Sequence, residues 1–374
     1  MSKLFSPIQI GGLHLKNRLV AAPMCQYSAV DGVIQPWHWQ HLGVLAISGV
    51  SVVIVEATGV VPEGRISPGD TGLWDDRQEA AFARLIKDIA SYSDTPVGIQ
   101  LAHAGRKAST HRPWQDKGGP LAPGDGAWTT YAPSPIPFND GWHTPAALDQ
   151  AGMDRLVEAF VAAAQRADRA GFALAELHGA HGYLISEFLS PIANHRTDDY
   201  GGSLENRMRF PLRIAEAVRA VWPRSKALGM RLNGSDWVEG GITPEETAEV
   251  SARLQGLGLD YVHISSGANA ARAVMPWKEP GYQVGFAETV KHRCPDLPVI
   301  AVGMIAGAHQ AEAILDEGKA DMIALARALL DDPRWPHHAA ETLEAGADAA
   351  SPWPVQYQRA AGAAWPGRAL RDFG

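Results

Sequence analysis

The sequence predicts an α/β protein folded as a (β/α)8 TIM barrel, and three observations predict it. Short runs rich in Val, Ile and Leu alternate with longer amphipathic stretches, and there are eight such runs, which is the strand count of this barrel. The runs lack strict apolar–polar alternation, as expected of parallel strands that are buried on both faces. A doubly wound sheet is the competing architecture, but the chain contains neither a GxGxxG nor a GxxxxGKS/T sequence.

The elements follow in order from the N-terminus. A short hairpin over Leu4–Leu15, turning at Gly11-Gly12, is expected to plug the floor of the barrel. The expected strands are Leu19–Pro23, Val52–Ala57, Val97–Ala102, Leu174–His178, Ala227–Asn233, Tyr261–Ser265, Val299–Gly303 and Met322–Leu325. The expected helices are Trp37–Gly49, Asp75–Tyr92, Asp149–Gly171, Leu204–Trp222, Pro244–Gly258, Phe286–Cys294 and Ala308–Glu317. Glycine closes several of them, as is preferred at helix C-termini.

The chain is longer than the roughly 250 residues that such a barrel needs. We expect a single domain over residues 1–374, with a lid insertion at about 105–145 after the third strand and a C-terminal arm at about 352–374. The lid stretch is dense in Pro, Gly and Trp, and loops of this length in compact domains commonly cover a binding site. Trp114, Trp128 and Trp142 are its candidates for shaping a pocket.

Composition and charge exclude several classes of protein. The 374 residues are 46% hydrophobic and 20% charged, which excludes a disordered chain, and the net charge of −8 does not favour a nucleic-acid partner. The N-terminus lacks the long apolar stretch of a signal peptide, and the most apolar segment, 43–55, is too short to span a bilayer. Cys25 and Cys294 leave one bridge open, but a reduced cytoplasmic protein is the simpler interpretation.

Polar or conformationally special residues stand at the carboxyl end of almost every expected strand. In chain order they are Met24, Cys25, Gln26, Tyr27, Glu56, Ala57, Thr58, Gln100, His103, His178, His181, Tyr183, Arg231, Asn233, His263, Ser265, Ser266, Gly303 and Arg327. In a barrel these ends meet at one mouth. An arginine within an apolar strand is costly to bury without a partner. The pattern therefore predicts a bound ligand that is partly anionic and rich in hydrogen-bonding edges.

The segment His178-Gly-Ala-His181-Gly-Tyr183 places three proton-carrying side chains within six positions. Two imidazoles can donate hydrogen bonds to one oxygen, and a nearby phenol can deliver a proton, so a clamp on a carbonyl oxygen is the favoured interpretation. A metal-binding histidine pair and a purely structural pair are the alternatives. The first strand offers no HxH and the chain has no HExxH helix, which weighs against the metal.

Three other candidates are ambiguous when each is taken alone. Cys25 is either a functional thiol or a buried packing residue, and Arg231 either binds a ligand or pairs with a core carboxylate. Arg327, after the eighth strand, is a plausible phosphate contact or a member of a surface salt bridge. Their common position at strand ends favours a shared site for all three.

Several longer motifs resemble the old yellow enzyme family, in particular its branch of xenobiotic reductases and small thermostable ene-reductases. The resemblance covers essentially the whole chain. Cys25 and His181 mark the branch, because other branches carry Thr near the first position and often Asn at the second. The matching stretches are APMCQY at 22–27, EAT at 56–58, PEGR at 62–65, IQLAHAGRK at 99–107, ELHGAHGY at 176–183 and HRTDDYGGSLENR at 195–207.

The resemblance implies FMN, bound non-covalently at the barrel mouth. It places Gln100 and Arg231 at the pyrimidine edge of the flavin, where a fixed cation stabilises negative charge. It implies that Cys25 tunes the flavin without acting as a nucleophile. The full set of implied cofactor contacts is Pro23, Met24, Cys25, Ala57, Gln100, Arg231, Gly303, Met304, Ala326 and Arg327.

The resemblance also implies an ene-reductase that uses NADPH or NADH as hydride donor. His178 and His181 would then bind the carbonyl or nitro oxygen of an activated alkene, and Tyr183 would supply a proton. Tyr27 would line the pocket and assist polarisation. A metal-dependent hydrolase using the two histidines and a non-catalytic flavoprotein sensing redox state through Cys25 are the alternatives.

The C-terminal segment PVQYQR, residues 354–359, is similar to the end of family members that push an arginine into a neighbouring subunit's pocket. This similarity implies a homodimer or higher homo-oligomer with Arg359 contributed across the interface. The chain departs from that pattern by continuing for another fifteen residues, to Gly374.

Overall fold

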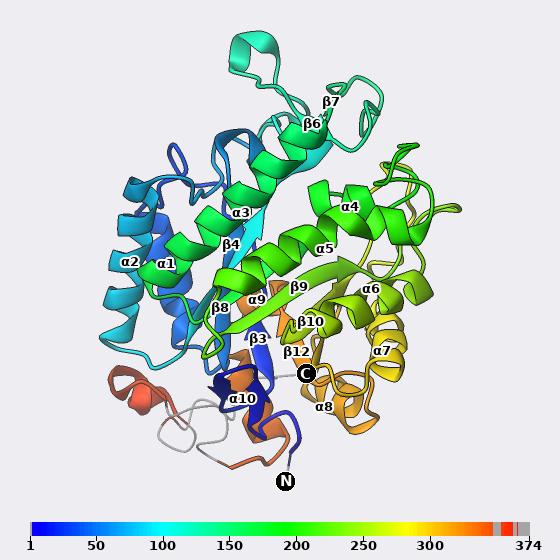
Figure 1. Cartoon of the computed structure of the whole chain (residues 1–374). Coiled ribbons are helices and arrows are strands. Elements are labelled where there is room, and N and C mark those ends of the chain that lie inside the picture. Colours follow the sequence, from blue (N-terminus) through cyan, green and yellow to red (C-terminus); the bar gives the residue numbers. More distant parts are fainter. Residues whose placement is uncertain (1, 347–352, 362–364, 366–374) are drawn as a thin grey trace.

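The computed structural model describes residues 2–346, 353–361 and 365, and its centre is a closed barrel of parallel strands (Figure 1). Each strand pairs with the next in chain order, and the last pairs with the first. The strands are β3 (Leu19–Ala21), β4 (Val52–Gly59), β5 (Val97–Ala102), β8 (Leu174–Gly179), β9 (Ala227–Asn233), β10 (Tyr261–Ser265), β11 (Val299–Ala301) and β12 (Met322–Leu325). The predicted TIM barrel is therefore confirmed.

Four of the predicted strands differ from the structure at their carboxyl ends. β3 ends at Ala21, before Pro23, whose nitrogen has no hydrogen for a sheet bond. β11 ends at Ala301, because Gly303 has a φ of 114°, outside the β region. β8 continues one residue further to Gly179, and β4 continues to Gly59 past a register shift between Val55 and Ala57.

The N-terminal hairpin forms where it was expected and closes the floor of the barrel. It consists of β1 (Ile8–Ile10) and β2 (Leu13–Leu15), which pair antiparallel around Gly11. Ile10 and Leu15 are buried in one cluster with apolar residues of the barrel interior, among them Val20, Val52 and Leu174. The hairpin thus excludes water from the amino ends of the strands.

Helices surround the barrel and bury their apolar faces against it (Figure 1). The bounds of the long ones agree with the predictions to within a few residues: α1 (Pro36–Ala46), α2 (Asp76–Ala90), α3 (Gln150–Ala170), α5 (Leu204–Val221), α6 (Pro244–Gly256), α7 (Val284–Arg293) and α8 (Ala308–Asp316). Local capping supports these starts; the Asp75 carboxylate, for example, accepts the amides of Arg77 and Gln78. The shorter helices α4 (Leu184–Leu189), α9 (Arg327–Asp331) and α10 (Trp335–Thr342) were not expected.

Residues 105–145 form a long excursion after β5. It contains three short 3-10 turns, η2 (Gly105–Lys107), η3 (Asp116–Gly118) and η4 (Pro123–Asp125), and strand β6 (Tyr131–Ala132), which pairs with β7 (Ala146–Ala147). The excursion lies at the top of Figure 1. Its Trp114 packs edge to face with Tyr27, which follows β3, and the ring centroid of its Phe138 lies 4.8 Å from Nζ of Lys107, which follows β5. The excursion therefore stands over the carboxyl ends of the barrel strands, where barrel sites are built.

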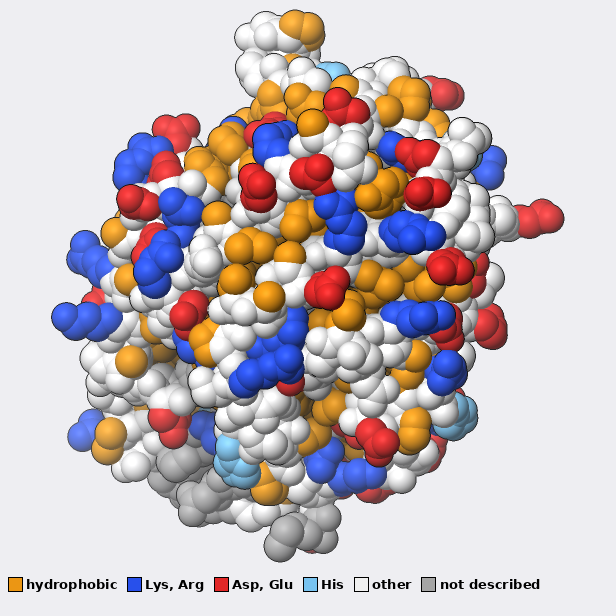
Figure 2. Space-filling model, in the orientation of Figure 1, with side chains coloured by type: hydrophobic (Ala, Val, Ile, Leu, Met, Phe, Trp, Pro, Cys, Tyr) orange, Lys and Arg blue, Asp and Glu red, His pale blue; other side chains and the backbone are white. Residues whose placement is uncertain are grey.

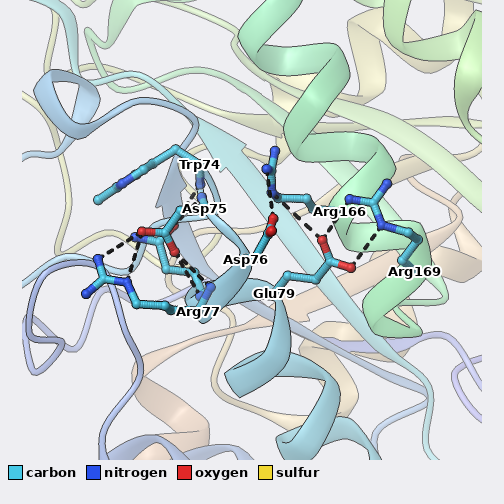
Figure 3. A network of polar contacts seen from close by, with 8 residues as sticks. Trp74, Asp75, Asp76, Arg77, Glu79, Arg166 and Arg169 are labelled. Carbon is cyan, nitrogen blue, oxygen red and sulfur yellow. Dashed lines mark hydrogen bonds and ion pairs between the residues drawn. The ribbon is translucent and has the colours of Figure 1, made fainter.

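The outer surface of the helical layer carries charges of both signs side by side (Figure 2). Between α2 and α3 these charges form a network of ion pairs (Figure 3). Arg169 donates to both carboxylate oxygens of Glu79 at 2.9 and 2.7 Å, and Arg166 reaches Asp76 at 3.1 Å. We call this set, Asp76, Glu79, Arg166 and Arg169, the α2–α3 network.

The described part of the C-terminal segment lies at the opposite end of the barrel from the mouth. Trp353 stacks on His337 with ring centroids 4.5 Å apart, and Arg334 lies over the rings of Trp353 and Tyr357. The 3-10 helix η5 (Val355–Ala360) follows; the rest of the arm expected at 352–374, apart from 353–361 and 365, lies outside the described residues. No helix among the described residues is long and apolar enough to cross a membrane.

Candidate functional site

A cavity of about 460 Å³ opens at the carboxyl ends of the strands. Residues that the sequence singled out line much of it: His181, Arg231, Ser265, Ser266, Gly303, Met304, Ala326 and Arg327. Tyr282 and Gln283 also line it and were missed. The strand ends therefore converge on one concave site, as the sequence predicted.

Arg231 lies on β9 and is buried at one side of this cavity, with 7% of its surface exposed. Its register partners on the neighbouring strands are His178 and His263. Its Nη2 is 3.4 Å from the hydroxyl of Ser265, and its Nε has no hydrogen-bond partner. Burial lowers the pKa of Arg231, and the charge of Glu176 acts in the opposite direction. A buried cation so poorly paired indicates that a ligand completes its surroundings.

Glu176, on β8, does not neutralise Arg231 by a direct contact, because other groups use its oxygens. One oxygen accepts a hydrogen bond from Gln100 Nε2 at 2.7 Å. The other lies 3.0 Å from His263 Nδ1 and 3.3 Å from the Tyr261 hydroxyl. This buried network fixes the Gln100 side chain. The amide nitrogen of Gln100 is bonded to Glu176, and its amide oxygen is not.

The rings of His178, His181 and Tyr183 lie together near Arg231, and His181 is the one of the three that lines the cavity. The rings of His178 and His181 meet edge to face with centroids 5.1 Å apart, and those of His178 and Tyr183 lie 5.0 Å apart. Burial, and next the charge of Arg231, lowers the pKa of both histidines well below the ordinary value, so both rings are neutral near pH 7. The amide of Ala180 lies 3.4 Å from His178 Nδ1, a contact that favours the proton of this ring on Nε2.

A left-handed turn sets the direction of the second histidine. His181 has a φ of 62°, its amide donates to Asn233 Oδ1 at 3.0 Å, and its Nε2 lies 2.7 Å from the Ser265 hydroxyl. Left-handed backbone is uncommon for residues other than glycine and is retained where surrounding contacts enforce it. The contacts to β9 and β10 thus hold His181 toward the cavity.

Cys25 and Tyr27 follow the carboxyl end of β3 and do not line the 460 Å³ cavity. Glu56 stands at the β4 register shift, where its carboxylate accepts the Gln26 amide at 2.7 Å and lies 3.3 Å from His38 Nε2. Burial raises the pKa of the Cys25 thiol, and the charge of Glu56 raises it further, so the thiol is protonated near pH 7. Burial also raises the pKa of Tyr27, with Cys25 and Tyr183 adding to it, which indicates that these groups face one space.

Pro23, Met24, Ala57 and Gln100 belong to the same part of the mouth but do not line the 460 Å³ cavity described above. Pro23 and Met24 follow β3, whereas Ala57 and Gln100 are register partners two residues before the ends of β4 and β5. The structure thus brings them next to one another at the carboxyl ends of β3, β4 and β5.

The lid tryptophans have separate surroundings. Trp114 lies edge to face with Tyr27 at 5.9 Å, and Trp142 with Phe138 at 4.8 Å. Trp128 packs under the guanidinium of Arg65, 5.1 Å from the ring centroid, and donates to the Glu63 carbonyl. Trp114 is therefore the tryptophan that contacts a predicted site residue.

The remaining predictions concern Arg359, a metal site at the histidine pair and the two cysteines. Arg359 is exposed on η5, far from the mouth of its own barrel. Within the described residues, no group of three or more His, Cys, Asp or Glu side chains is placed to hold a metal ion, so His178 and His181 have no third ligand there. Cys25 and Cys294 are both free thiols.

The fold and this site define a class of protein, a barrel oxidoreductase with a flavin at its mouth, and comparison with known proteins agrees. Residues 3–345 match the NADH:flavin oxidoreductase / NADH oxidase family, and the chain belongs to this family. It is 42% identical over 358 residues to an NADPH dehydrogenase of Geobacillus thermodenitrificans, covering 95% of this chain and 98% of the relative. An NADPH dehydrogenase of Bacillus subtilis is 41% identical over 359 residues, with 96% and 98% covered.

Solved structures lead to the same family. Morphinone reductase in complex with tetrahydroNAD has a TM-score of 0.75 and 30% identity, covering 92% of each chain. A 2-naphthoyl-CoA reductase complex has a TM-score of 0.80 and 26% identity, covering 91% of this chain and 52% of the other. The protein is thus an old yellow enzyme-type, NAD(P)H-dependent flavin oxidoreductase, and its cofactor is FMN. The metal-dependent hydrolase is excluded by this membership.

The geometry fits FMN on its own evidence. The cavity joins a buried, incompletely paired cation, Arg231, to a loop in which Gly303 and Met304 have positive φ. A Cβ at Gly303 would lie 2.3 Å from Gln283 Nε2, so this loop cannot carry a larger residue without moving its neighbour. Arg327 is exposed and lines the cavity beside this loop, with its Nη2 3.6 Å from Met304 Sδ. The surroundings of Arg231 therefore suit a hydrogen-bonding ring edge, and those of the Gly303 loop and Arg327 suit a phosphate.

Proposed function

We propose that the protein is an ene-reductase, which reduces the double bond of an alkene conjugated to a carbonyl or nitro group. One observation carries this proposal: the neutral rings of His178 and His181 and the phenol of Tyr183 stand together beside the flavin cavity. Neutral imidazoles donate hydrogen bonds without adding charge, and a phenol is a proton source. The set suits a substrate that presents an oxygen and a carbon to be protonated.

FMN would be held by residues of the cavity and by residues at the neighbouring strand ends. FMN, when bound, supplies reversible hydride chemistry between the nicotinamide and the alkene. Arg231 and Gln100 would meet its pyrimidine edge, where a fixed cation stabilises negative charge. The remaining contacts would come from the backbone of Pro23 and Met24, from Cys25 and Ala57, and, at the phosphate, from Gly303, Met304, Ala326 and Arg327, of which the last four line the cavity.

The substrate oxygen accepts hydrogen bonds from His178 and His181, which withdraw electron density from the double bond. This polarisation makes the β-carbon a hydride acceptor, and Tyr183 delivers the proton to the α-carbon. Tyr27, facing the same space as Tyr183, lines the pocket and assists the polarisation. Burial raises the pKa of the Tyr183 phenol well above its ordinary value, so it stays protonated until the carbon takes the proton.

We further propose a cytoplasmic homodimer or higher homo-oligomer in which Arg359 completes a neighbouring subunit's pocket. Support comes from the position of Arg359, which is exposed on η5 and free of its own barrel mouth. Loss of substrate affinity in Arg359→Ala, with FMN retained, is the expected result. An unchanged KM would remove Arg359 from the pocket.

The proton step separates this proposal from a non-catalytic flavoprotein. In Tyr183→Phe, reduction of 2-cyclohexenone should slow by about 100-fold, within the usual range for general acids, while reduction of bound FMN by NADPH continues at nearly the normal rate. Stopped-flow spectroscopy measures the two half-reactions separately. Tyr92→Phe, at the other end of the barrel, is the matched control. Equal losses in both half-reactions, or no turnover by the unmodified protein, would overturn the proposal.

A further inference from the structure

Lys107 occupies a position that the proposed mechanism has not used. It ends the turn η2 after β5, and its ammonium is enclosed by two backbone carbonyls and two aromatic rings. Nζ donates to the His181 carbonyl at 2.8 Å and to the Ala268 carbonyl at 2.9 Å. It lies 4.9 Å from the ring centroid of Tyr183 and 4.8 Å from that of Phe138. Lys107 thus joins the histidine turn, the loop after β10 and the lid.

Both carbonyls belong to turns that have left-handed backbone. His181 has a φ of 62° and Ala268 a φ of 63°. Neither is a glycine, so each turn is costly unless outside contacts enforce it. A hydrogen bond from a charged donor is stronger than one between neutral groups, and Lys107 supplies one to each turn.

The electrostatic surroundings of Tyr183 give the ammonium a second consequence. Burial raises the pKa of Tyr183, and the neighbouring Cys25 and Asp70 raise it further, so these influences oppose departure of the phenol proton. A cation over the face of a ring is attracted to its electrons, and that attraction grows when the phenol becomes a phenolate. Lys107 therefore favours the charge that proton transfer creates.

The ammonium remains charged at neutral pH despite its enclosure. Burial lowers the pKa of Lys107 to about 8, the charge of Glu187 raises it, and that of Arg106 lowers it. The titratable or charged groups that face it come from its own turn, from β8 and the turn after it, and from α4: Arg106, His178, His181, Tyr183 and Glu187.

We propose that Lys107 is a positioning residue for proton delivery, which holds the His181–Tyr183 turn in place and stabilises the phenolate that Tyr183 becomes. This inference rests on the proposed function, because it assumes that Tyr183 is the proton donor. In the step, the O–H bond of Tyr183 breaks and a C–H bond forms at the α-carbon, whose electron pair was released when hydride reached the β-carbon. The phenolate then recovers a proton from water.

The test compares three variants in the FMN-loaded protein. Lys107→Met keeps a side chain of similar length and removes the charge. It should slow reduction of 2-cyclohexenone by about tenfold, because an interaction between a desolvated cation and an aromatic ring contributes on that scale. It should also increase the solvent isotope effect on that reaction. Reduction of FMN by NADPH, and reoxidation by ferricyanide, which takes no proton from Tyr183, should stay within about twofold. Lys107→Arg should restore most of the rate.

The matched control is Lys226→Met. Lys226 also donates to a backbone carbonyl, that of Asp168, and lies 5.3 Å from the ring centroid of Trp222, but at the amino ends of the strands. Lys226→Met should leave alkene reduction, FMN reduction by NADPH and reoxidation by ferricyanide unchanged. A parallel loss of all three rates in Lys107→Met would show a merely structural lysine and overturn the proposal.

Two comparisons separate this inference from the function on which it rests. If Tyr183→Phe leaves alkene reduction unchanged, the proposed proton donor itself is wrong; if that variant is slow and Lys107→Met is not, only the role of Lys107 is wrong.

The pH profile adds a third readout. Alkene reduction should fall as pH rises through about 8, the pKa of Lys107, and this fall should vanish in Lys107→Arg, whose guanidinium stays charged. An identical fall in both proteins would overturn the role of the charge.

Discussion

Two arginine-containing regions of this protein differ in how the positive charge is paired: the α2–α3 network and the barrel mouth. In the α2–α3 network each guanidinium faces a carboxylate on a neighbouring helix, as Arg169 does with both oxygens of Glu79 (Figure 3). At the barrel mouth, Arg231 is buried, its Nε has no partner, and the nearest acid, Glu176, is bonded to His263 and Gln100. The guanidinium groups of the surface network are thus paired with carboxylates, whereas that of Arg231 lies inside and has a hydroxyl at 3.4 Å as its hydrogen-bond partner.

This difference separates a structural role from a binding role. Exposed ion pairs contribute about 0–1 kcal/mol each to stability, and their loss is tolerated. A buried cation without a full set of partners costs free energy, and such a cost persists where a ligand offsets it. A buried guanidinium that is bonded to a hydroxyl at 3.4 Å rather than to a carboxylate, as that of Arg231 is, therefore points to a binding site.

The largest effect is expected for Arg231→Met. FMN affinity should fall by about 10- to 100-fold, because hydrogen bonds to charged groups contribute about 1.5–3 kcal/mol. The apoprotein should be no less stable than the unmodified apoprotein, since a costly buried charge has been removed. Fluorescence titration with FMN and thermal unfolding of both apoproteins measure the two quantities. A large fall in apoprotein stability with unchanged FMN affinity would contradict the binding role.

The next effect concerns the histidine clamp. His181→Ala should weaken binding of a phenol ligand by about tenfold, because one hydrogen bond to its oxygen is lost. His181→Asn should lose less, since asparagine tolerates the φ of 62° and can still donate. Because both histidines are neutral, binding should not change between about pH 6.5 and 8, below the phenol's own ionisation. The long-wavelength charge-transfer band reports the affinity; equal binding by all three proteins would remove His181 from the clamp.

Much of the fold was predictable because its signals are local. Buried parallel strands are short and rich in branched apolar residues, and Val97–Ala102, Ala227–Asn233 and Tyr261–Ser265 were identified with their observed bounds. The strand errors fell at carboxyl ends: a proline and a positive φ end β3 and β11 early, and β4 and β8 run further than predicted; three short helices were also missed. Where a strand ends depends on neighbouring strands, which a single stretch of sequence does not describe.

The site was predictable as far as it follows strand ends. Arg231 and His181 line the cavity as expected, whereas Gln283 was missed because it comes after a loop that no periodic pattern describes. Gln283 donates to the Val302 carbonyl at 3.0 Å and accepts from Ser266 at 2.6 Å, so it supports the Gly303 loop. The sequence identified Lys107 only as the last residue of the matching stretch 99–107 and gave no role for it. Its partners are backbone carbonyls of turns distant in the chain, which side-chain patterns do not reveal.

A smaller effect is expected for Glu56→Gln, which changes a charge without removing a hydrogen-bond acceptor. The amide oxygen can still accept from Gln26, so the β3 loop should keep its place. Loss of the negative charge should lower the pKa of the Cys25 thiol, because Glu56 raises it in the unmodified protein. The pH dependence of alkylation at Cys25, with Cys294→Ser as background, measures this change. An unchanged thiol pKa would show that burial alone sets it.

The smallest effect is expected in the α2–α3 network, and it tests the other half of the comparison. Arg169→Gln removes both bonds to Glu79 but leaves Arg166 within 3.8 Å of the same carboxylate. Since exposed ion pairs contribute about 0–1 kcal/mol, the free energy of unfolding should fall by less than about 1 kcal/mol, and FMN affinity should not change. Added salt screens surface charges, so the difference between variant and unmodified protein should shrink as ionic strength rises. A loss of several kcal/mol that persists in high salt would mean that the surface network, like the mouth, depends on charges withdrawn from water.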